Sequence, residues 1–295
     1  MNRWMLRAYA KINLGLRISG KRADGYHDLD TCFLQISLAD CLFFEKLGSA
    51  RLEFTCNWPE IPANHRNLCV QAYDLITRKT GQSAGLRLHL QKNIPSGSGL
   101  GGGSSDAAVT LMAVNRLHHL GLSKRDLHGL ALELGSDVPF FLEGGLCRGQ
   151  GRGEILSPNV QIPSVWVLLA TTEISVSTAS VYKNIKLGLT KSCWNSTFAL
   201  SKLKYFEGCN PETLGINDLE GIVFQWYPQL SALRDNLLKL GAMGANMTGS
   251  GSAVFGVFNS CQAARQAQQA FRSEYRTIIA RPVKWGYEDV ESFLR

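Results

Sequence analysis

The stretch Pro95-Ser-Gly-Ser-Gly-Leu-Gly-Gly-Gly-Ser-Ser-Asp-Ala-Ala108 contains five glycines within nine residues. It follows a predicted strand at 85–94 and precedes a predicted helix at 106–120, with Ser104 or Ser105 expected as the N-cap. Glycine lets backbone N–H groups turn toward a ligand, and a helix N-terminus adds about half a positive charge. These features predict a phosphate-binding loop whose serine hydroxyls can contact phosphate or Mg²⁺.

Known phosphate-binding signatures do not describe this loop. Gly97, Gly99 and Gly102 fit the spacing of a dinucleotide fingerprint, but about 20 residues further on the chain has a turn and a helix cap instead of an acidic strand end. Residues 15–21 have Walker spacing without the final Ser or Thr, and the protein-kinase motifs are missing. Two more glycine patches, at 149–154 and 248–252, complete what a nucleotide cleft between two lobes needs.

The composition excludes several classes of protein. The chain has 295 residues, a formal net charge of +7 and 45% hydrophobic residues, which is globular composition. No apolar run approaches the ~18 residues of a membrane helix, and the N-terminus lacks a signal segment, so we expect neither membrane insertion nor secretion. The eight scattered cysteines favour reduced thiols and a cytoplasmic location. The basic surplus suits nucleic acid or anionic substrates, but no block of five like charges supports more than a mildly basic surface.

Hydrophobic periodicity predicts an α+β chain with two lobes. Beyond the elements that flank the loop, strands are expected at 6–18, 165–170 and 253–258. Helices are expected from the Ser123 cap to residue 134, as a short turn opened by Pro139, after Asp218 and at 261–274. Residues 183–216 are polar and unassigned. We place the boundary near 155–160, which gives lobes of 1–157 and 158–295.

Three motifs, taken in order, resemble the GHMP kinase superfamily. They are Ala10-Lys-Ile-Asn-Leu-Gly15, the loop at 95–108 and Met247-Thr-Gly-Ser-Gly-Ser252. The resemblance implies an N-terminal lobe like domain 2 of ribosomal protein S5 and a C-terminal α/β sandwich. It also implies an active site between the lobes that uses ATP and Mg²⁺.

Three further stretches are similar to one branch of that superfamily. They are Gly20-Lys-Arg-Ala-Asp-Gly-Tyr-His-Asp-Leu29, Leu134-Gly-Ser-Asp-Val-Pro-Phe-Phe-Leu142 and Asn217-Asp-Leu-Glu220. This branch phosphorylates the 2-hydroxyl of a cytidine-diphospho methylerythritol in the non-mevalonate isoprenoid pathway. The implied partner is therefore a small cytidine diphosphate derivative, with no nucleic acid and no membrane, and the chain is expected as a monomer or weak homodimer.

Two rival functions stay open at this point. A sister sugar or alcohol kinase is the nearer one, and the Tyr26-His27 pair argues against it. A non-catalytic nucleic-acid-binding protein with an S5-like lobe would explain the charge. It gives no reason for Lys11, Asp137 and three glycine patches in one chain.

The resemblance assigns catalytic roles to Lys11 and Asp137. From its position alone, Asp137 before Val138-Pro139 is a helix N-cap, and Lys11 is a strand lysine at a solvated edge. The resemblance implies instead that Asp137 accepts the proton of the attacking hydroxyl, while Lys11 orients it and stabilises developing charge. Asn13, two residues along the strand, shares the face of Lys11.

The remaining site residues follow from the same resemblance. Those expected to bind the substrate are Asn13, Tyr26, His27, Tyr182, Thr248, Gly249 and Ser250, with cytosine held between Tyr26 and Tyr182. Those expected to hold ATP phosphates are Pro95, Gly97, Gly99, Leu100, Gly101, Gly102, Gly103, Ser104, Ser105 and Asp106, with Asn67, Leu68, Lys92 and Asn93 around adenine. The Mg²⁺ ligands are unassigned, with Ser105 as the candidate.

Overall fold

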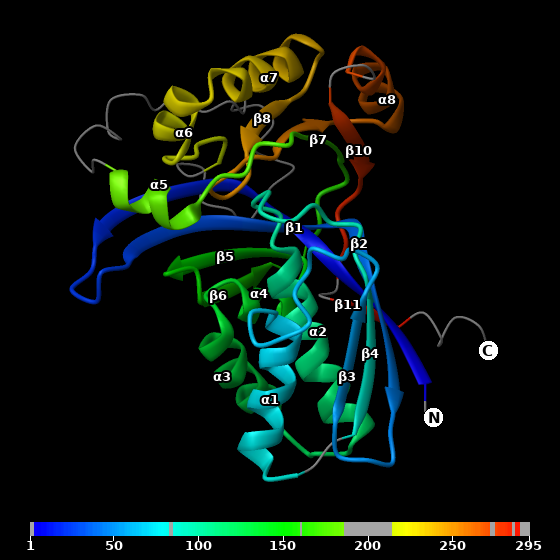
Figure 1. Cartoon of the computed structure of the whole chain (residues 1–295). Helices are drawn as coiled ribbons and strands as arrows, with labels where there is room; N and C mark the ends of the chain where they lie inside the picture. Colours follow the sequence, from blue (N-terminus) through cyan, green and yellow to red (C-terminus); the bar gives the residue numbers. More distant parts are fainter. Residues whose placement is uncertain are drawn as a thin grey trace.

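Two long antiparallel strands, β1 (Arg3–Lys21) and β2 (His27–Lys46), run through the centre of the molecule (Figure 1). The structure is a computed structural model that describes residues 3–82, 85–159, 161–185, 214–271, 275–284 and 287–289. The pairing of β1 with β2 shifts register near residues 9, 13 and 18. Such bulges bend a strand, and both strands curve between an upper and a lower lobe (Figure 1).

The first sheet has the order β11-β1-β2-β4-β3, and β5 joins β2 to β6. Its other strands are β3 (Leu52–Cys56), β4 (Leu86–Gln91), β5 (Leu146–Gly151), β6 (Ile155–Asn159) and β11 (Tyr287–Asp289). Only the β3–β4 pair among these described strands is parallel. The C-terminal strand β11 returns to pair with β1, so both ends of the chain contribute to this sheet.

Four helices pack on the lower part of the first sheet (Figure 1). They are α1 (Leu68–Thr80), α2 (Gly102–Leu117), α3 (Lys124–Leu134) and α4 (Val138–Glu143). Their apolar faces bury Phe140 and Phe141 of α4 against Phe33 and Phe44 of β2. This core fixes where α2 and α4 begin, and both helix starts face the upper lobe.

The second sheet lies between the first sheet and a layer of helices. It is antiparallel, with the order β10-β7-β9-β8, and its strands are β7 (Trp166–Thr171), β8 (Gly244–Met247), β9 (Val254–Phe258) and β10 (Arg276–Ala280). Val167 and Leu169 of β7 pack toward β1 and β2, whereas Leu168 and Ala170 pack with the helices. The covering helices are α5 (Thr178–Asn184), α6 (Glu220–Trp226), α7 (Pro228–Lys239) and α8 (Cys261–Ala270).

The predicted α+β class and two-lobed architecture are confirmed, with several changes in detail. The N-cap prediction for α2 is wrong, because the helix starts after Gly101 in a left-handed conformation and has no side-chain cap. The predicted Ser123 cap of α3 is confirmed, and it forms a capping box with Asp126. The helix expected after Asp218 is two helices, divided at Tyr227-Pro228.

The division into 1–157 and 158–295 stays a prediction. Strand β6 extends across residue 157, and the chain enters the second sheet at Trp166. Of the unassigned segment 183–216, only 183–185 and 214–216 lie within the described residues, and residues 272–274 of the predicted last helix lie outside them.

The sequence also predicted that the chain does not insert into a membrane and that its thiols are reduced. No helix within the described ranges combines the length and the apolar character needed to cross a bilayer. Cys41, Cys56, Cys69, Cys147 and Cys261 are free thiols. Cys32 is disulfide-bonded, so the prediction of reduced thiols is wrong at that residue.

Candidate active site

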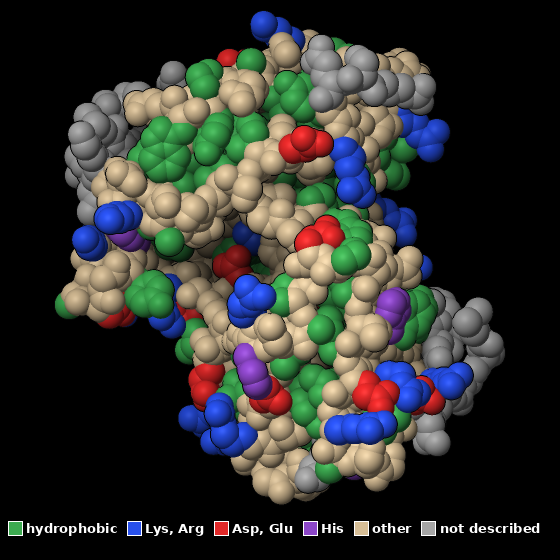
Figure 2. Space-filling model, in the orientation of Figure 1, with side chains coloured by type: hydrophobic (Ala, Val, Ile, Leu, Met, Phe, Trp, Pro, Cys, Tyr) green, Lys and Arg blue, Asp and Glu red, His purple; other side chains and the backbone are tan. Residues whose placement is uncertain are grey.

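A cavity of about 1040 Å³ lies at the junction of the two lobes. Its walls come from β1, the glycine loop before α2, the start of α4, helix α5 and the loop after β8. Figure 2 shows this hollow in the middle of the molecule, with charged side chains inside it. The cavity therefore collects residues from positions 11 to 250 of the chain.

The glycine loop forms one wall in a conformation that requires glycine. Gly97, Gly99 and Gly101 have φ values of +66°, +77° and +72°. A Cβ at Gly99 would lie 2.1 Å from the Thr248 carbonyl oxygen, so the upper lobe approaches the loop directly. Since no side chain caps α2, its first N–H groups can receive an anion, and Gly102, Gly103 and Ser104 line the cavity.

Backbone hydrogen bonds fasten this loop to both lobes. Lys11 N donates to Leu100 O at 2.9 Å, which ties the loop to β1. Ala253 N donates to Ser98 O at 3.1 Å, and Thr248 Oγ1 donates to Gly99 O at 3.3 Å, which tie it to the second sheet. These hydrogen bonds hold the loop between the two lobes.

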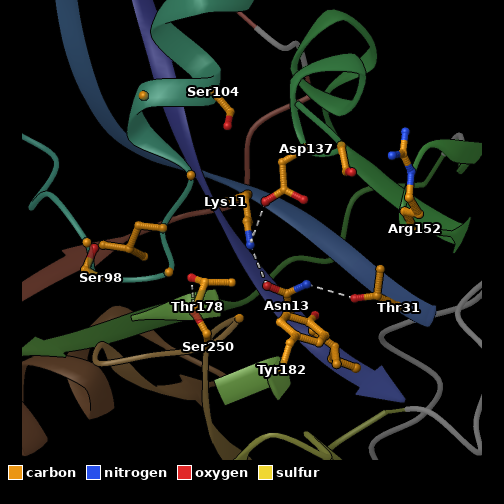
Figure 3. A pocket seen from close by; sticks show the side chains of 18 of the residues that line it. Lys11, Asn13, Thr31, Ser98, Ser104, Asp137, Arg152, Thr178, Tyr182 and Ser250 are labelled. Atoms are coloured by element: carbon orange, nitrogen blue, oxygen red, sulfur yellow. Dashed lines mark hydrogen bonds and ion pairs between the residues drawn. The ribbon is translucent and has the colours of Figure 1, made fainter. Parts of the chain in front are cut away.

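Opposite the loop, Lys11 and Asp137 form an ion pair of 3.4 Å between Nζ and Oδ2 (Figure 3). The Lys11 side chain is 4% exposed and that of Asp137 is 36% exposed. Lys11 Nζ also donates to Asn13 Oδ1 at 2.7 Å, and Asn13 Nδ2 donates to Thr31 Oγ1 at 2.8 Å. The prediction that Lys11 and Asn13 share a face of the strand is thus confirmed, and the more accessible partner of the pair is the carboxylate.

Asp137 stands at the N-cap position of α4, but its side chain makes no capping hydrogen bond. The carboxylate turns to the buried Lys11 ammonium instead. An Asp that leaves its own helix uncapped gives up a stabilising contact, which is typically about 1 kcal/mol. The structural role that its position suggests is therefore not the role its side chain performs.

Aromatic and basic side chains line the far end of the cavity. His27 is buried, and its ring lies 5.4 Å from that of Tyr182 at a 33° tilt. Tyr26 is 53% exposed, and the guanidinium of Arg152 lies 4.6 Å from the centre of its ring. Burial lowers the pKa of His27, and nearby Lys21 lowers it further, so the imidazole is neutral at neutral pH. A flat, neutral ligand can stack and hydrogen-bond here.

The loop after β8 closes the cavity from the upper lobe. Gly249 and Ser250 line it, while Thr248 is fully buried behind them. Ser250 Oγ and Thr178 Oγ1 are 2.7 Å apart, so this loop is joined to α5, the helix that carries Tyr182 (Figure 3).

Most residues expected from the sequence do line the cavity, and five do not. Asn67 caps α1 through a 2.8 Å bond from Cys69 N, and the others away from the wall are Asn93, Ser105, Asp106 and Thr248. Ser105 is fully buried, and its hydroxyl has no hydrogen-bond partner among the described residues, whereas its neighbour Ser104 faces the cavity.

Sequence reasoning missed several wall residues. Arg152 stands in the glycine patch at 149–154, which was assigned to the cleft without naming the arginine, so a signal existed for it. Thr31 and Thr178 carry no local signal, because strand pairing and lobe packing bring them to the site.

Behind the glycine loop, Lys92 lies between two buried carboxylates, Asp40 and Asp106. Its ammonium is in contact with Asp40 and lies 2.9 Å from Asp106 Oδ2. The other Asp40 oxygen accepts the N–H groups of Asn93, at 2.5 Å, and Ile94, at 2.8 Å. Burial alone would lower the pKa of Lys92, but the two carboxylates raise it overall. Sequence analysis placed Lys92 near adenine, whereas its charge is already paired within the protein.

Comparisons with known proteins agree with this geometry. Residues 67–145 match the GHMP kinases N terminal domain and residues 206–277 match the GHMP kinases C terminal domain. The homoserine kinase of Cytophaga hutchinsonii has a TM-score of 0.74 at 16% identity, covering 98% of each chain, which shows a common fold. The chain is a member of the GHMP kinase family.

Nearer relatives narrow this class. The 4-diphosphocytidyl-2-C-methyl-D-erythritol kinase of Chloroherpeton thalassium is 39% identical over 92% of this chain and 95% of that protein. The enzyme of the same name from Syntrophomonas wolfei is 35% identical over 93% of this chain and 96% of that protein. A crystal structure of 4-(cytidine 5'-diphospho)-2C-methyl-D-erythritol kinase superposes with a TM-score of 0.80 at 36% identity, covering 94% of this chain and 98% of that one. Within the GHMP kinases, the chain belongs to the 4-diphosphocytidyl-2-C-methyl-D-erythritol kinases.

The buried cluster behind the loop gives a testable pH dependence. Burial raises the pKa of Asp106 to about 8, with Lys92 opposing and Asp40 adding to the rise. An unfolded Asp has a pKa of about 3.9, so the folded protein binds the extra proton between about pH 4 and 8. The stability from this group is therefore complete below about pH 4 and is lost as the pH rises through the folded value.

We expect the variant Asp106→Asn, which stays neutral, to gain in melting temperature relative to the natural protein as the pH rises from 6 to 9. Asp24→Asn is the control: local desolvation raises the pKa of this exposed carboxyl, but hydrogen bonds from Tyr26 N and Arg22 lower it overall. Its difference from the natural protein should be constant over the same range. A constant difference for Asp106→Asn as well would show that Asp106 holds no proton.

Proposed function

We propose that the chain is an ATP-dependent kinase that phosphorylates the 2-hydroxyl of 4-diphosphocytidyl-2-C-methyl-D-erythritol, in the non-mevalonate route to isoprenoid precursors. The names of its relatives give a kinase and this cytidine-diphospho substrate. The single observation that carries the proposal is the 3.4 Å pair of Lys11 and Asp137, in one cavity with the glycine loop. Phosphoryl transfer needs positioned charge more than covalent chemistry, and this cavity supplies it.

In the proposed reaction, the substrate hydroxyl attacks the γ-phosphorus of ATP. Its proton passes to the Asp137 carboxylate, the new bond between oxygen and phosphorus forms, and the bond to the β-phosphate oxygen breaks to release ADP. Lys11 orients the Asp137 carboxylate and lies where it can stabilise charge on the attacking oxygen. Asn13 holds Lys11 in that position.

The glycine loop and the start of α2 are proposed to bind the ATP phosphates. Mg²⁺ commonly keeps most of its contacts with substrate phosphates and takes only one or two protein ligands. The cavity fits this pattern, because the hydroxyl of Ser104 and the carboxylate of Asp137 are among the oxygen donors that line it. Among the described residues no cluster of three His, Cys, Asp or Glu side chains could hold a metal independently of ATP. The bound ion would neutralise charge on the β- and γ-oxygens, and Ser104 replaces Ser105 as the candidate ligand.

The aromatic end is proposed to recognise cytosine. A neutral His27 can hydrogen-bond the edge of the base, and the rings of Tyr26 and Tyr182 offer stacking surfaces. Burial raises the pKa of Tyr182, and the charge of Asp137 raises it further, so its phenol stays neutral. Arg152, which lies over Tyr26, is near enough to that surface to meet an anionic diphosphate.

Product analysis tests the function directly. The protein is incubated with Mg²⁺, ATP labelled at the γ-phosphorus and the cytidine-diphospho alcohol, beside a panel of sugar alcohols, homoserine and mevalonate. We expect label on the 2-position of the cytidine compound and none on the others. Label on another alcohol would mean a sister kinase, and tight, salt-sensitive RNA binding without ATP turnover would favour the nucleic-acid alternative.

The catalytic pair predicts a specific loss. Asp137→Asn removes the proton acceptor while keeping the size of the side chain, and Lys11→Ala removes its partner. Each variant should lose on the order of 10²–10³ in kcat, as is typical for a preorganised charge. Circular dichroism should show both folded. Unchanged turnover, or unfolding of both variants, would make the pair structural.

The glycine loop predicts a matched comparison of two glycines. Gly101 and Gly121 have φ values of +72° and +71°, so alanine costs about 1–2 kcal/mol of backbone strain at either position. A Cβ at Gly121 meets nothing within 4 Å, whereas one at Gly101 would lie 2.7 Å from Phe141 Cζ and 3.2 Å from Lys11 Cε. We expect Gly121→Ala to be destabilised with normal kinetics, and Gly101→Ala to lose about 10²-fold in kcat/KM for ATP. Equal kinetics would show that the contact does not matter.

The proposed role of the aromatic end predicts that substitutions there raise the KM for the cytidine substrate and leave the KM for ATP unchanged. Base stacking on an aromatic ring is worth about 1–3 kcal/mol, so Tyr26→Leu and Tyr182→Leu should raise the KM for the cytidine substrate about 5- to 150-fold. The KM for ATP should stay within about twofold and serves as the internal control. Equal rises in both constants would place the two tyrosines outside the cytosine site.

Three accompanying expectations stay predictions. They are a cytoplasmic location, a monomer or weak homodimer, and the absence of a nucleic-acid partner.

A further inference from the structure

We propose that Asn217, in the motif Asn217-Asp-Leu-Glu220, is a positioning residue for catalysis that acts through the loop after β8 on the Lys11–Asp137 pair. The inference rests on the proposed kinase function. It concerns a segment, 215–220, whose residues are not among those that line the cavity. We call residues 215–220 the adapter segment.

The adapter segment lies along the free edge of β1 beyond the catalytic residues. Gly215 N donates to Leu14 O at 2.9 Å, Leu16 N to Ile216 O at 2.7 Å, and Asp218 N to Leu16 O at 3.0 Å. The Asp218 carboxylate accepts a further bond from Ile18 N at 2.8 Å. Four hydrogen bonds thus fix this segment to the strand that carries Lys11 and Asn13.

Asn217 reaches from this fixed segment to the loop of the upper lobe. Its Nδ2 donates to Met247 O at 2.8 Å and to Gly249 O at 2.9 Å, and its Oδ1 accepts Leu219 N at 3.0 Å. The residue is 5% exposed. One amide therefore uses both donors on the two carbonyls that flank Thr248, so it sets the position of that residue.

Glu220 holds the same loop through the backbone N–H of Met247, whose carbonyl is held by Asn217. Its Oε1 accepts Met247 N at 2.7 Å, and its Oε2 accepts Arg234 Nη1 at 3.0 Å. Burial raises the pKa of Glu220 to about 7, although the Met247 N–H and Arg234 oppose the rise. Both polar groups of Met247 are thus held by the two ends of one four-residue motif.

From Thr248 the contacts continue to the catalytic pair. Thr248 Oγ1 accepts Asn13 N at 3.1 Å and lies 3.3 Å from Asn13 Oδ1 and from Gly99 O. Asn13 Oδ1 accepts the Lys11 ammonium, which pairs with Asp137. The Thr248 hydroxyl therefore lies where the loop after β8, the glycine loop and strand β1 meet. A shift of this hydroxyl changes the acceptor that holds Lys11.

A double-mutant cycle tests the coupling. Asn217→Asp replaces the NH₂ group, which donates two hydrogen bonds, with an oxygen that faces the Met247 and Gly249 carbonyl oxygens. Thr248→Val removes the hydroxyl with little change in the shape of the side chain. Each single variant should lose about 10-fold or more in kcat, with the KM for ATP within about twofold. If both act through one contact, the double variant should lose little more than the more severe single variant.

Asn115 gives a matched control. Its side chain also binds backbone, since Nδ2 donates to Leu122 O and Oδ1 accepts Leu122 N, both at 3.0 Å, but it lies on α2 away from the cavity. Asn115→Asp should keep the natural kcat, and the double variant with Thr248→Val should have the same kcat as Thr248→Val alone. Asn217→Ser removes the amide NH₂ group without adding charge. It replaces Asn217→Asp in the double-mutant cycle if that variant does not fold.

The outcomes separate this inference from the proposed function. An inactive natural protein would overturn the kinase proposal itself. An active natural protein whose Asn217 and Thr248 effects multiply independently would overturn the positioning role. A lower melting temperature with an unchanged kcat for Asn217→Asp would do the same, because it would show that Asn217 serves stability alone.

Discussion

The buried ammonium of Lys11 is the constraint on which the site depends. A charged lysine that is 3% exposed must be compensated, and Asn13 and Asp137 supply the partners. Asn13 is provided by the same strand, but Asp137 arrives only if α4 starts directly above it. The positions of α4 and of the lower core are therefore tied to the charge at the base of the cavity.

Strand β1 can serve both lobes because its two halves pack on different layers. Leu6 and Ala8 belong to the lower core, whereas Ile12 and Leu14 pack against the second sheet. The register shift near Tyr9 and Ala10 marks the change from one to the other. Lys11 alternates along the strand with Ala10 and Ile12, which belong to the core against the second sheet, so its side chain faces away from that core. It points into the cavity, where the glycine loop and the loop after β8 also meet.

The cavity has two chemically different ends. The glycine loop, the start of α2 and the Lys11–Asp137 pair form the end that we propose for the ATP phosphates. The opposite end depends on Tyr26, His27 and Tyr182, which come from the β1–β2 hairpin and from α5.

Local chemistry allowed the sequence alone to determine much of this protein. Five glycines before a helix, the Ser123 cap and the period-two strands each depend on neighbours within a few residues, and the motifs at Lys11, Asp137 and Tyr26 indicated the family. Only the tertiary structure decided that Asp137 leaves its cap for Lys11, that Lys92 is paired with Asp40, and that Ser104 instead of Ser105 faces the cavity. These facts depend on which distant surfaces meet and how a helix is rotated, and the free energy that fixes them comes from burial across the whole chain, which no local pattern records.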